Sequence, residues 1–194
     1  MTGPDLTRAD WSREEFTGQA WTDTRLVQAD LSEALLSRCT FQGCDLTGAD
    51  LAGAVLDSCA LLGCTLSRIH LFGTTLRGCK LTGSTLSGVD ARGLVVEGGD
   101  WSYLIARGTD LRRVNLADVR LAEADLSDAD LRDADLSGAD LSHARLRGAK
   151  LRGADLRGAR LDGCDVNNLD WTGVRIDLAQ AVLLAQARGA LVEP

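Results

Sequence analysis

The chain has 194 residues, of which 45% are hydrophobic and only 4% aromatic, and its formal net charge is −7. This length favours a single domain with an aliphatic core, and the acidic balance excludes nucleic-acid binding through bulk charge. No apolar run approaches the roughly 20 residues of a membrane helix, and the first residues, MTGPDLTRADWS, lack the basic and apolar regions of a signal peptide, so we expect a cytoplasmic protein with no membrane segment.

An apolar residue recurs at every fifth position from Leu6 to Ile176, through 35 repeats without insertion or deletion. We call these residues the centres; their numbers end in 1 or 6. A period of five is neither the strand period of 2 nor the helix period of 3.6. Eighteen of the 21 glycines lie two residues after a centre. The position two residues before each centre, the small inward position, is alanine without exception from Ala124 to Ala159.

Each five-residue unit consists of a small residue, often Asp or Asn, then Leu or another apolar centre, and two further residues. This unit resembles the A-(D/N)-L-x-x motif of pentapeptide-repeat proteins, and the resemblance covers about residues 4 to 177. The resemblance implies an all-β solenoid, a right-handed quadrilateral β-helix in which four repeats form one square coil of 20 residues. Centres and small inward positions would point inward, and glycine or polar residues would form the corners. About nine coils, stacked about 4.8 Å apart, would form a rod over residues 1–177.

All six cysteines occupy small inward positions: Cys39, Cys44, Cys59, Cys64, Cys79 and Cys164. A free thiol fits such a site as a small hydrophobe, so we interpret them as core thiols. Residues 20 apart would stack, so a disulfide or a redox or metal site is the alternative, although no CxxC spacing occurs.

The repeat is irregular over residues 87–108, SGVDARGLVVEGGDWSYLIARG. Val89, Leu94 and Leu104 replace alanine at small inward positions, while Ala91 and Ala106 are unusually small centres. This exchange conserves interior volume. It predicts a local bulge or bend, or a functional kink.

One face of the coil is acidic when every fourth repeat is aligned. The residue before the centre, the pre-centre position, is Asp in seven of nine coils on this face, interrupted by His70 and Lys150. A column of Arg92, Arg112, Arg132 and Arg152 runs beside it and would partly offset the repulsion between carboxylates. Asp there can simply hydrogen-bond a turn; alternatively, the column imitates the regular charge of duplex DNA. We call it the acidic ladder: Asp10, Asp30, Asp50, Asp90, Asp110, Asp130 and Asp170.

After Ile176 the period ends, and residues 178–194 read as a helix and tail. Asp177 suits an N-cap, and Gly189 suits the C-terminal end of the helix. A solenoid end needs a cap, but the apolar residues exceed what a cap requires, so either they only cap the rod or part of them joins a second chain. The expected dimer interface is Leu178, Val182, Leu183, Leu184, Leu191 and Val192.

No sequence motif points to catalysis, a cofactor or a metal. Both histidines, His70 and His143, would point outward on different sides of the coil without matched ligands. We therefore predict a non-catalytic protein.

The closing GVRIDLAQAVLLAQARGAL and the central GVDARGLVVEGGDW resemble the MfpA-like and Qnr-like pentapeptide-repeat proteins. That resemblance implies a DNA-mimicking homodimer, joined through its C-terminal helices, that binds DNA gyrase and topoisomerase IV and protects them from quinolones or natural gyrase poisons. The uninterrupted five-residue repeat leaves no room for the projecting loops of Qnr-like proteins. The positive charge of the basic stretch Arg145–Arg160 differs from the negative charge expected of a DNA mimic. A scaffold with an unrelated partner is the alternative.

Overall fold

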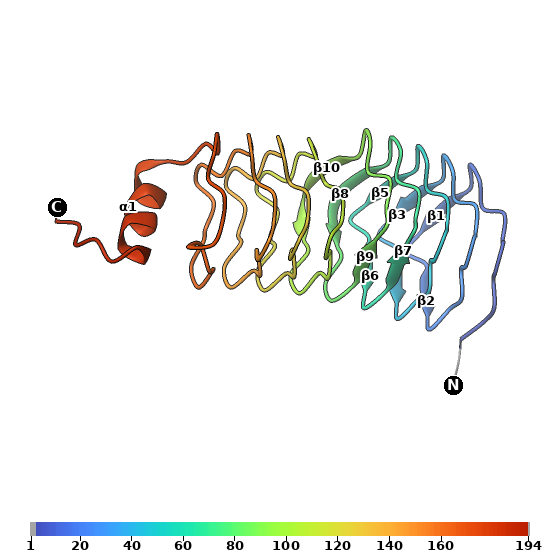
Figure 1. Ribbon diagram of the computed structural model, residues 1–194. Coiled ribbons are helices and arrows are strands. Elements are labelled where there is room, and N and C mark those ends of the chain that lie inside the picture. The colour runs from blue at the N-terminus through green and yellow to red at the C-terminus, as the bar shows by residue number, and fades with distance from the viewer. Residues whose placement is uncertain (1–2, 194) are drawn as a thin grey trace.

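The structure is a computed structural model that describes residues 3–193. Its chain winds into a rod of stacked coils, with the N-terminus at one end and a single helix at the other (Figure 1). The predicted β-solenoid with a short C-terminal helix is therefore confirmed. The helix α1 is Leu178–Ala187, and no helix within residues 3–193 has the length and apolar character to cross a membrane.

Ten short strands lie in the N-terminal part of the rod, and they pair in parallel with a register of 20 residues. Phe16, for example, pairs with Leu36, and Leu36 with Leu56. The strands are β1 (Glu15–Thr17), β2 (Ala20–Thr22), β3 (Leu35–Ser37), β4 (Thr40–Gln42), β5 (Val55–Asp57), β6 (Ala60–Leu62), β7 (Thr65–Ser67), β8 (Thr75–Lys80), β9 (Thr85–Ser87) and β10 (Val95–Asp100).

The core is a column of centres packed on small inward residues, as the five-residue period predicts. Leu121, Leu126, Leu131 and Leu136 are each 0% exposed, and so are the alanines Ala124 and Ala129 between them. The four leucines fill one coil from its four sides. At the N-terminal end the aromatic centres stack instead, with the rings of Trp21 and Phe41 4.7 Å apart.

The cysteines are core thiols, as expected. All six are free; five are buried and Cys164 is half-buried. Cys39 and Cys59 stack, with the Cys39 N–H donating to the Cys59 Sγ at 3.4 Å. Burial raises the pKa of Cys59 to about 12 and that of Cys79 to about 11. Thiols held in the protonated form are poor nucleophiles and poor metal ligands.

Aspartate before a centre turns the chain by accepting hydrogen bonds from the residue after that centre. Asp135 accepts from the Ser137 N–H at 2.9 Å and from the Ser137 hydroxyl at 2.6 Å. The same bond from the backbone N–H recurs at Asp10, Asp50 and Asp130. This Asx turn ends the extended segment early, and accordingly none of the strands begins with Asp.

The irregular segment opens the coil stack on two of the four sides. In most of the rod each coil bonds to the next: the Leu111 N–H, for example, donates to the Asp130 carbonyl at 2.9 Å. No equivalent hydrogen bond joins residues 88–98 to residues 108–117, although the Trp101 N–H still donates to the Arg120 carbonyl at 2.7 Å. We call this opening the coil gap. The predicted irregularity is thus a separation of coils on two sides, and a second separation lies between residues 145–153 and 165–173.

The helix α1 caps the last coil. Asp177 is its N-cap, and Gln180 completes a capping box, while Gly189 at φ 86° follows the C-cap, as the sequence predicts. Gln180 is 4% exposed, and its Nε2 donates to the carbonyls of Leu156 and Ala159. The Leu156 carbonyl also accepts from the Ala159 N–H, so the Gln180 amide mainly serves the exposed coil edge at Ala159. Leu183 packs against the core.

Candidate protein-binding face

The acidic ladder lies on one face of the rod in two runs. Asp10, Asp30 and Asp50 follow one another through backbone bridges, and His70 and Asp90 continue the run. A second run joins Asp110, Asp130 and Lys150. The coil gap separates the runs, and Asp170 stands beyond the second gap, exposed. The structure therefore brings the predicted residues onto one face but does not form one continuous column.

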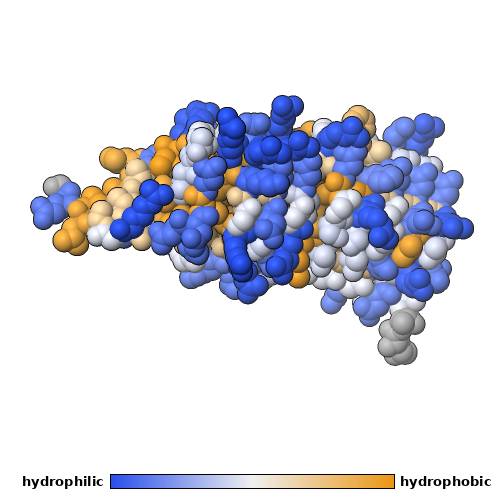
Figure 2. Space-filling model, in the orientation of Figure 1, coloured by the Kyte–Doolittle hydropathy of each residue, from blue (hydrophilic) through white to orange (hydrophobic). Residues whose placement is uncertain are grey.

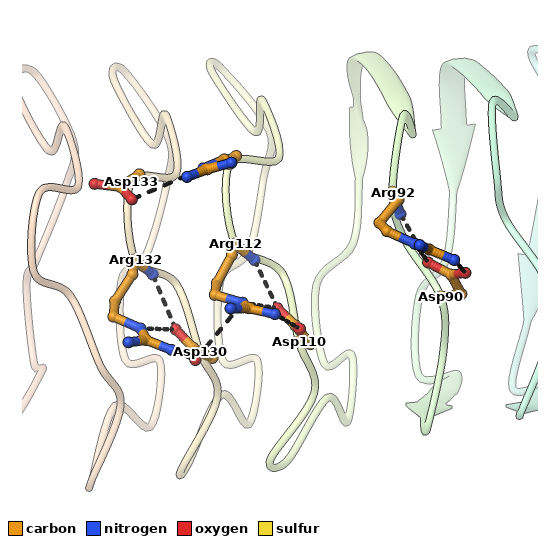
Figure 3. Close-up of polar contacts among 8 residues, drawn as sticks. Asp90, Arg92, Asp110, Arg112, Asp130, Arg132 and Asp133 are labelled. Carbon is orange, nitrogen blue, oxygen red and sulfur yellow. Dashed lines mark hydrogen bonds and ion pairs between the residues drawn. The ribbon is translucent and has the colours of Figure 1, made fainter.

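The middle of the ladder is neutralised by arginines two residues along the chain. Arg92 contacts Asp90 at 2.5 Å, and Arg112 and Arg132 contact Asp110 and Asp130 at 2.6 Å, each through two guanidinium nitrogens (Figure 3). Charge-assisted bonds of this kind hold the carboxylates ionised. The Arg92 guanidinium lowers the pKa of Asp90 to about 2.

These pairs form within one side of a coil, between the residue before a centre and the residue after it. The repeat period places the arginines on the same face but does not pair them with individual carboxylates. The signal is the repeated Asp-x-Arg of DAR and DLR, which occurs again at Asp155 and Arg157.

The N-terminal run carries its charge without such partners. Asp10 accepts from the Ser12 N–H and hydroxyl, and Asp30 does the same with Ser32. The hydroxyl of Ser12 lowers the pKa of Asp10. Asp50 accepts from the Ala52 N–H, and the His70 imidazole lies 4.0 Å away. The ladder carboxylates without an arginine ion pair within residues 3–193 are therefore Asp10, Asp30, Asp50 and Asp170. The first three lie together in one run, and we call them the N-terminal triad.

Half of the six basic residues in the stretch near the C-terminal end pair with acidic residues. Arg145 lies 3.7 Å from Asp125, and Arg160 lies 3.6 Å from Asp140, both in neighbouring coils. Arg157 contacts Asp155 within its own coil at 2.6 Å, and its guanidinium lowers the pKa of Asp155 to about 2. Part of the local positive charge is thus compensated within the rod.

An apolar surface lies at the C-terminal end of the rod, where Figure 2 shows hydrophobic residues over the helix. Of the predicted interface residues, Leu178 is 81% exposed and Leu191 95%. Val192 is exposed as well, whereas Val182, Leu183 and Leu184 are half-buried, and Leu183 packs against the core. The tail therefore caps the rod and also exposes apolar side chains.

No group of three or more His, Cys, Asp or Glu in residues 3–193 is arranged to hold a metal ion. The Nδ1 of His143 lies so close to Gly163 that a Cβ atom on residue 163 would have no space. His70 is exposed beside Asp50.

Two family models of pentapeptide repeats match the chain. Pentapeptide repeats (8 copies) match residues 103–133 and 129–168, and a pentapeptide repeat region matches residues 14–90. No curated protein sequence matches the chain significantly.

Solved structures of similar shape include a trypsin-treated variant of QnrB1, described as a plasmid-mediated fluoroquinolone resistance protein. It is 26% identical, with a TM-score of 0.89 over 100% of this chain and 97% of that one. Full-length QnrB1 is 23% identical, with a TM-score of 0.85 over 98% of this chain and 99% of that one. HetL from Nostoc, a pentapeptide-repeat protein involved in heterocyst differentiation regulation, is 29% identical, with a TM-score of 0.54 over 90% of this chain and 85% of that one.

Proposed function

This chain belongs to the pentapeptide-repeat family, and from that membership we propose that it is a non-catalytic protein that binds DNA gyrase and topoisomerase IV in place of DNA. By binding there it would protect the enzyme from quinolones or from a natural gyrase poison. The observation that carries the proposal is the similarity to QnrB1 along the whole chain, since QnrB1 is described as a fluoroquinolone resistance protein.

The acidic ladder offers a physical basis for the imitation of DNA. Duplex DNA carries one negative charge per about 1.7 Å, and proteins bind it through Lys and Arg. Carboxylates repeated once per coil, about 4.8 Å apart, present regular negative charge on a straight rod. Because arginines neutralise the middle of the ladder, the N-terminal triad is the part best suited to meet a basic groove.

We further propose that two rods join through their C-terminal ends. Leu178 and Leu191 are exposed next to the half-buried apolar residues of α1, and apolar surface of this kind marks a protein interface. A two-fold dimer would cover the same patch on both copies. The rod would then double in length.

A gyrase supercoiling and cleavage assay tests the function. The purified protein is added with and without a quinolone, and the cleaved DNA is quantified. We expect less quinolone-dependent cleavage as protein is added. Unchanged supercoiling together with unchanged cleavage would contradict the proposal.

Matched charge variants test the role of the N-terminal triad. Replacing all three residues by Asn removes three charges but keeps the acceptor of each Asx turn. The control replaces Asp5, Asp45 and Asp165, which make the same turns on another face, by Asn. We expect the triad variant to lose gyrase affinity about tenfold or more, with a smaller loss in the control. Equal losses would indicate that only net charge matters.

Dimerisation is tested by variants that leave the cap intact. Leu178→Asp with Leu191→Asp removes exposed apolar contacts while Gln180 keeps its bonds to the last coil. Light scattering after size exclusion should report a dimer for the original chain and a monomer for the variant. A variant that stays dimeric would place the interface elsewhere.

A scaffold that binds an unrelated partner is the second candidate. The similarity to HetL, a regulator of differentiation on the same kind of rod, favours it. A chain that dimerises but leaves gyrase activity and quinolone-induced cleavage unchanged would support this role.

A further inference from the structure

The coil gap contains a groove in the middle of the acidic ladder. Its volume is about 620 Å³, enough for about 20 water molecules at about 30 Å³ each. Figure 3 shows the wider separation plainly: the pair Asp90–Arg92 stands farther from Asp110–Arg112 than the latter stands from Asp130–Arg132. The groove is polar at its rim and closed at its base by the buried residues Val89 and Ala91.

Both walls of the groove present backbone groups that lack the partners they have in other coils. On one wall these are the N–H groups of Ala91 and Gly93 and the carbonyl of Val89. On the other wall they are the carbonyls of Asp110 and Arg112. The equivalent groups one coil further on are bonded, such as the Arg113 N–H to the Arg132 carbonyl at 3.1 Å. Strand β10 continues the first wall: it pairs with β8 on one edge, and on its other edge the Arg120 N–H bonds to the Gly99 carbonyl at the end of the strand.

Larger side chains lie inside the rod at the opening. On the two open sides, Val89 lies in the coil before Thr109, and Leu94 in the coil before Val114. Most coils that remain bonded have a small residue in such a pair, as with Ala129 on Ala149, although the coils that stack Ile69 on Val89 also stay bonded. All four residues at the opening are buried, so their side chains fill the interior where the coils separate.

The charge at the groove differs from that of the rest of the rod. Four arginines and three aspartates line it, in a chain whose net charge is −7. Within residues 3–193 the ion pairs at the groove each stay on one wall: Arg92 with Asp90, and Arg112 with Asp110. Arg113 is 84% exposed, with only Asp133 near it, at 4.0 Å. A carboxylate entering the groove would meet guanidinium groups that have room for a second partner.

We propose that the coil gap is a docking site for an extended, carboxylate-bearing segment of a partner protein. The segment would lie between the two coils as an added strand, with its backbone bonded to the unpaired groups and its acidic side chains against Arg92 and Arg113. Affinity would come from the backbone bonds, and the preference for acidic segments from the arginines. The proposal does not depend on which enzyme binds the acidic ladder.

The test uses capped synthetic peptides and amide NMR signals of the full chain. The probe is acetyl-Glu-Val-Glu-Val-Glu-amide. One control replaces Glu by Lys, and another methylates the backbone nitrogens, which removes the donors needed for strand pairing. We expect saturable shifts at Ala91, Gly93 and Asp110, and at least about tenfold weaker binding of both controls. Equal binding of the methylated peptide, or shifts confined to the rod ends, would overturn the proposal.

Matched variants separate docking from general charge attraction. Arg113→Glu reverses a charge at the groove, and Arg68→Glu does so at the same corner position of another side, with φ 53° against 62° at Arg113. Glu already occupies such corners at Glu33 and Glu123, so both variants should fold. We expect about tenfold weaker peptide binding for Arg113→Glu and little change for Arg68→Glu. An equal effect of the two would contradict a defined site.

Hydrogen exchange tests the opening itself, without any ligand. The amides of Ala91 and Gly93 should exchange much faster than those of Leu111 and Arg113, which are bonded to the next coil. Equally slow exchange would show that the groove is closed in solution and would sink the proposal.

Discussion

Two parts of the rod follow the same five-residue period but hold their coils differently. The N-terminal block, residues 3–100, contains all ten strands, whereas the C-terminal block, residues 101–177, pairs through isolated bridges and turns. In the C-terminal block, acidic pre-centre residues dominate, and each begins an Asx turn. Arginines then pair with many of these carboxylates. One period thus supports two kinds of wall: one built largely from strands and a charged one built from turns.

One stack also changes conformation along the rod. Thr65 and Thr85 lie in the paired strands β7 and β9, whereas Ile105, a strong strand former, lies in a turn side that bridges to Thr85 and to Asp125. His70 forms bridges with Asp50 and Asp90 in the same way. Hydrogen bonds between residues 20 apart therefore join strand sides to turn sides, and neighbouring coils need not share one conformation.

The largest effect on stability is expected when the side chain of a core centre is removed from either block. Leu131→Ala in the C-terminal block and Leu36→Ala in the N-terminal block each delete a buried side chain and should cost about 2–5 kcal/mol of unfolding free energy. Urea unfolding measures both. Similar costs would show that the two blocks share one kind of core and differ only in their walls. A much smaller cost for Leu131→Ala would instead make ion pairs the main support of the C-terminal block.

A smaller effect is expected from removal of one Asx turn. Asp135→Ala leaves the Ser137 N–H without its acceptor and should cost about 1 kcal/mol, by analogy with the loss of a helix N-cap. Asp135→Asn keeps an acceptor and is the control. Thr65→Ala, which changes the pre-centre residue of β7, should alter stability by less, because no side-chain cap is lost there. Equal losses at Asp135 and Thr65 would remove the distinction between the walls.

The smallest expected effect is a pH dependence of the charged wall. Arg157 and Arg175 hold Asp155 with a pKa of about 2, below its ordinary value of 3.8. Since the folded pKa is depressed, the stabilisation is complete above about pH 4 and is lost as the pH falls towards 2. The difference in urea midpoint between the original chain and Asp155→Asn should therefore shrink over that interval. A difference that stays constant from pH 5 to pH 2 would show that the pairing does not stabilise the rod.

Sequence patterns predicted which side chains point inward, that the cysteines are core thiols, and that the helix starts at Leu178. Each of these features depends on residues close together in the chain. The acidic ladder could be placed on one face for the same reason. Its neutralisation at Asp90, Asp110 and Asp130 could have been predicted from the Asp-x-Arg spacing, but the geometry of each pair depends on the turn that brings the two side chains together.

The amino-acid sequence by itself determined the period, the solenoid and which residues fill its core, since an apolar residue every fifth position must face one interior. Only the tertiary structure decided where the coils separate, which carboxylates pair with an arginine, and that Gln180 is buried where the helix caps the last coil. These features depend on contacts between coils, 20 residues apart or more. Whether two coils bond depends on side chains and backbone groups from both coils, and no single repeat contains both.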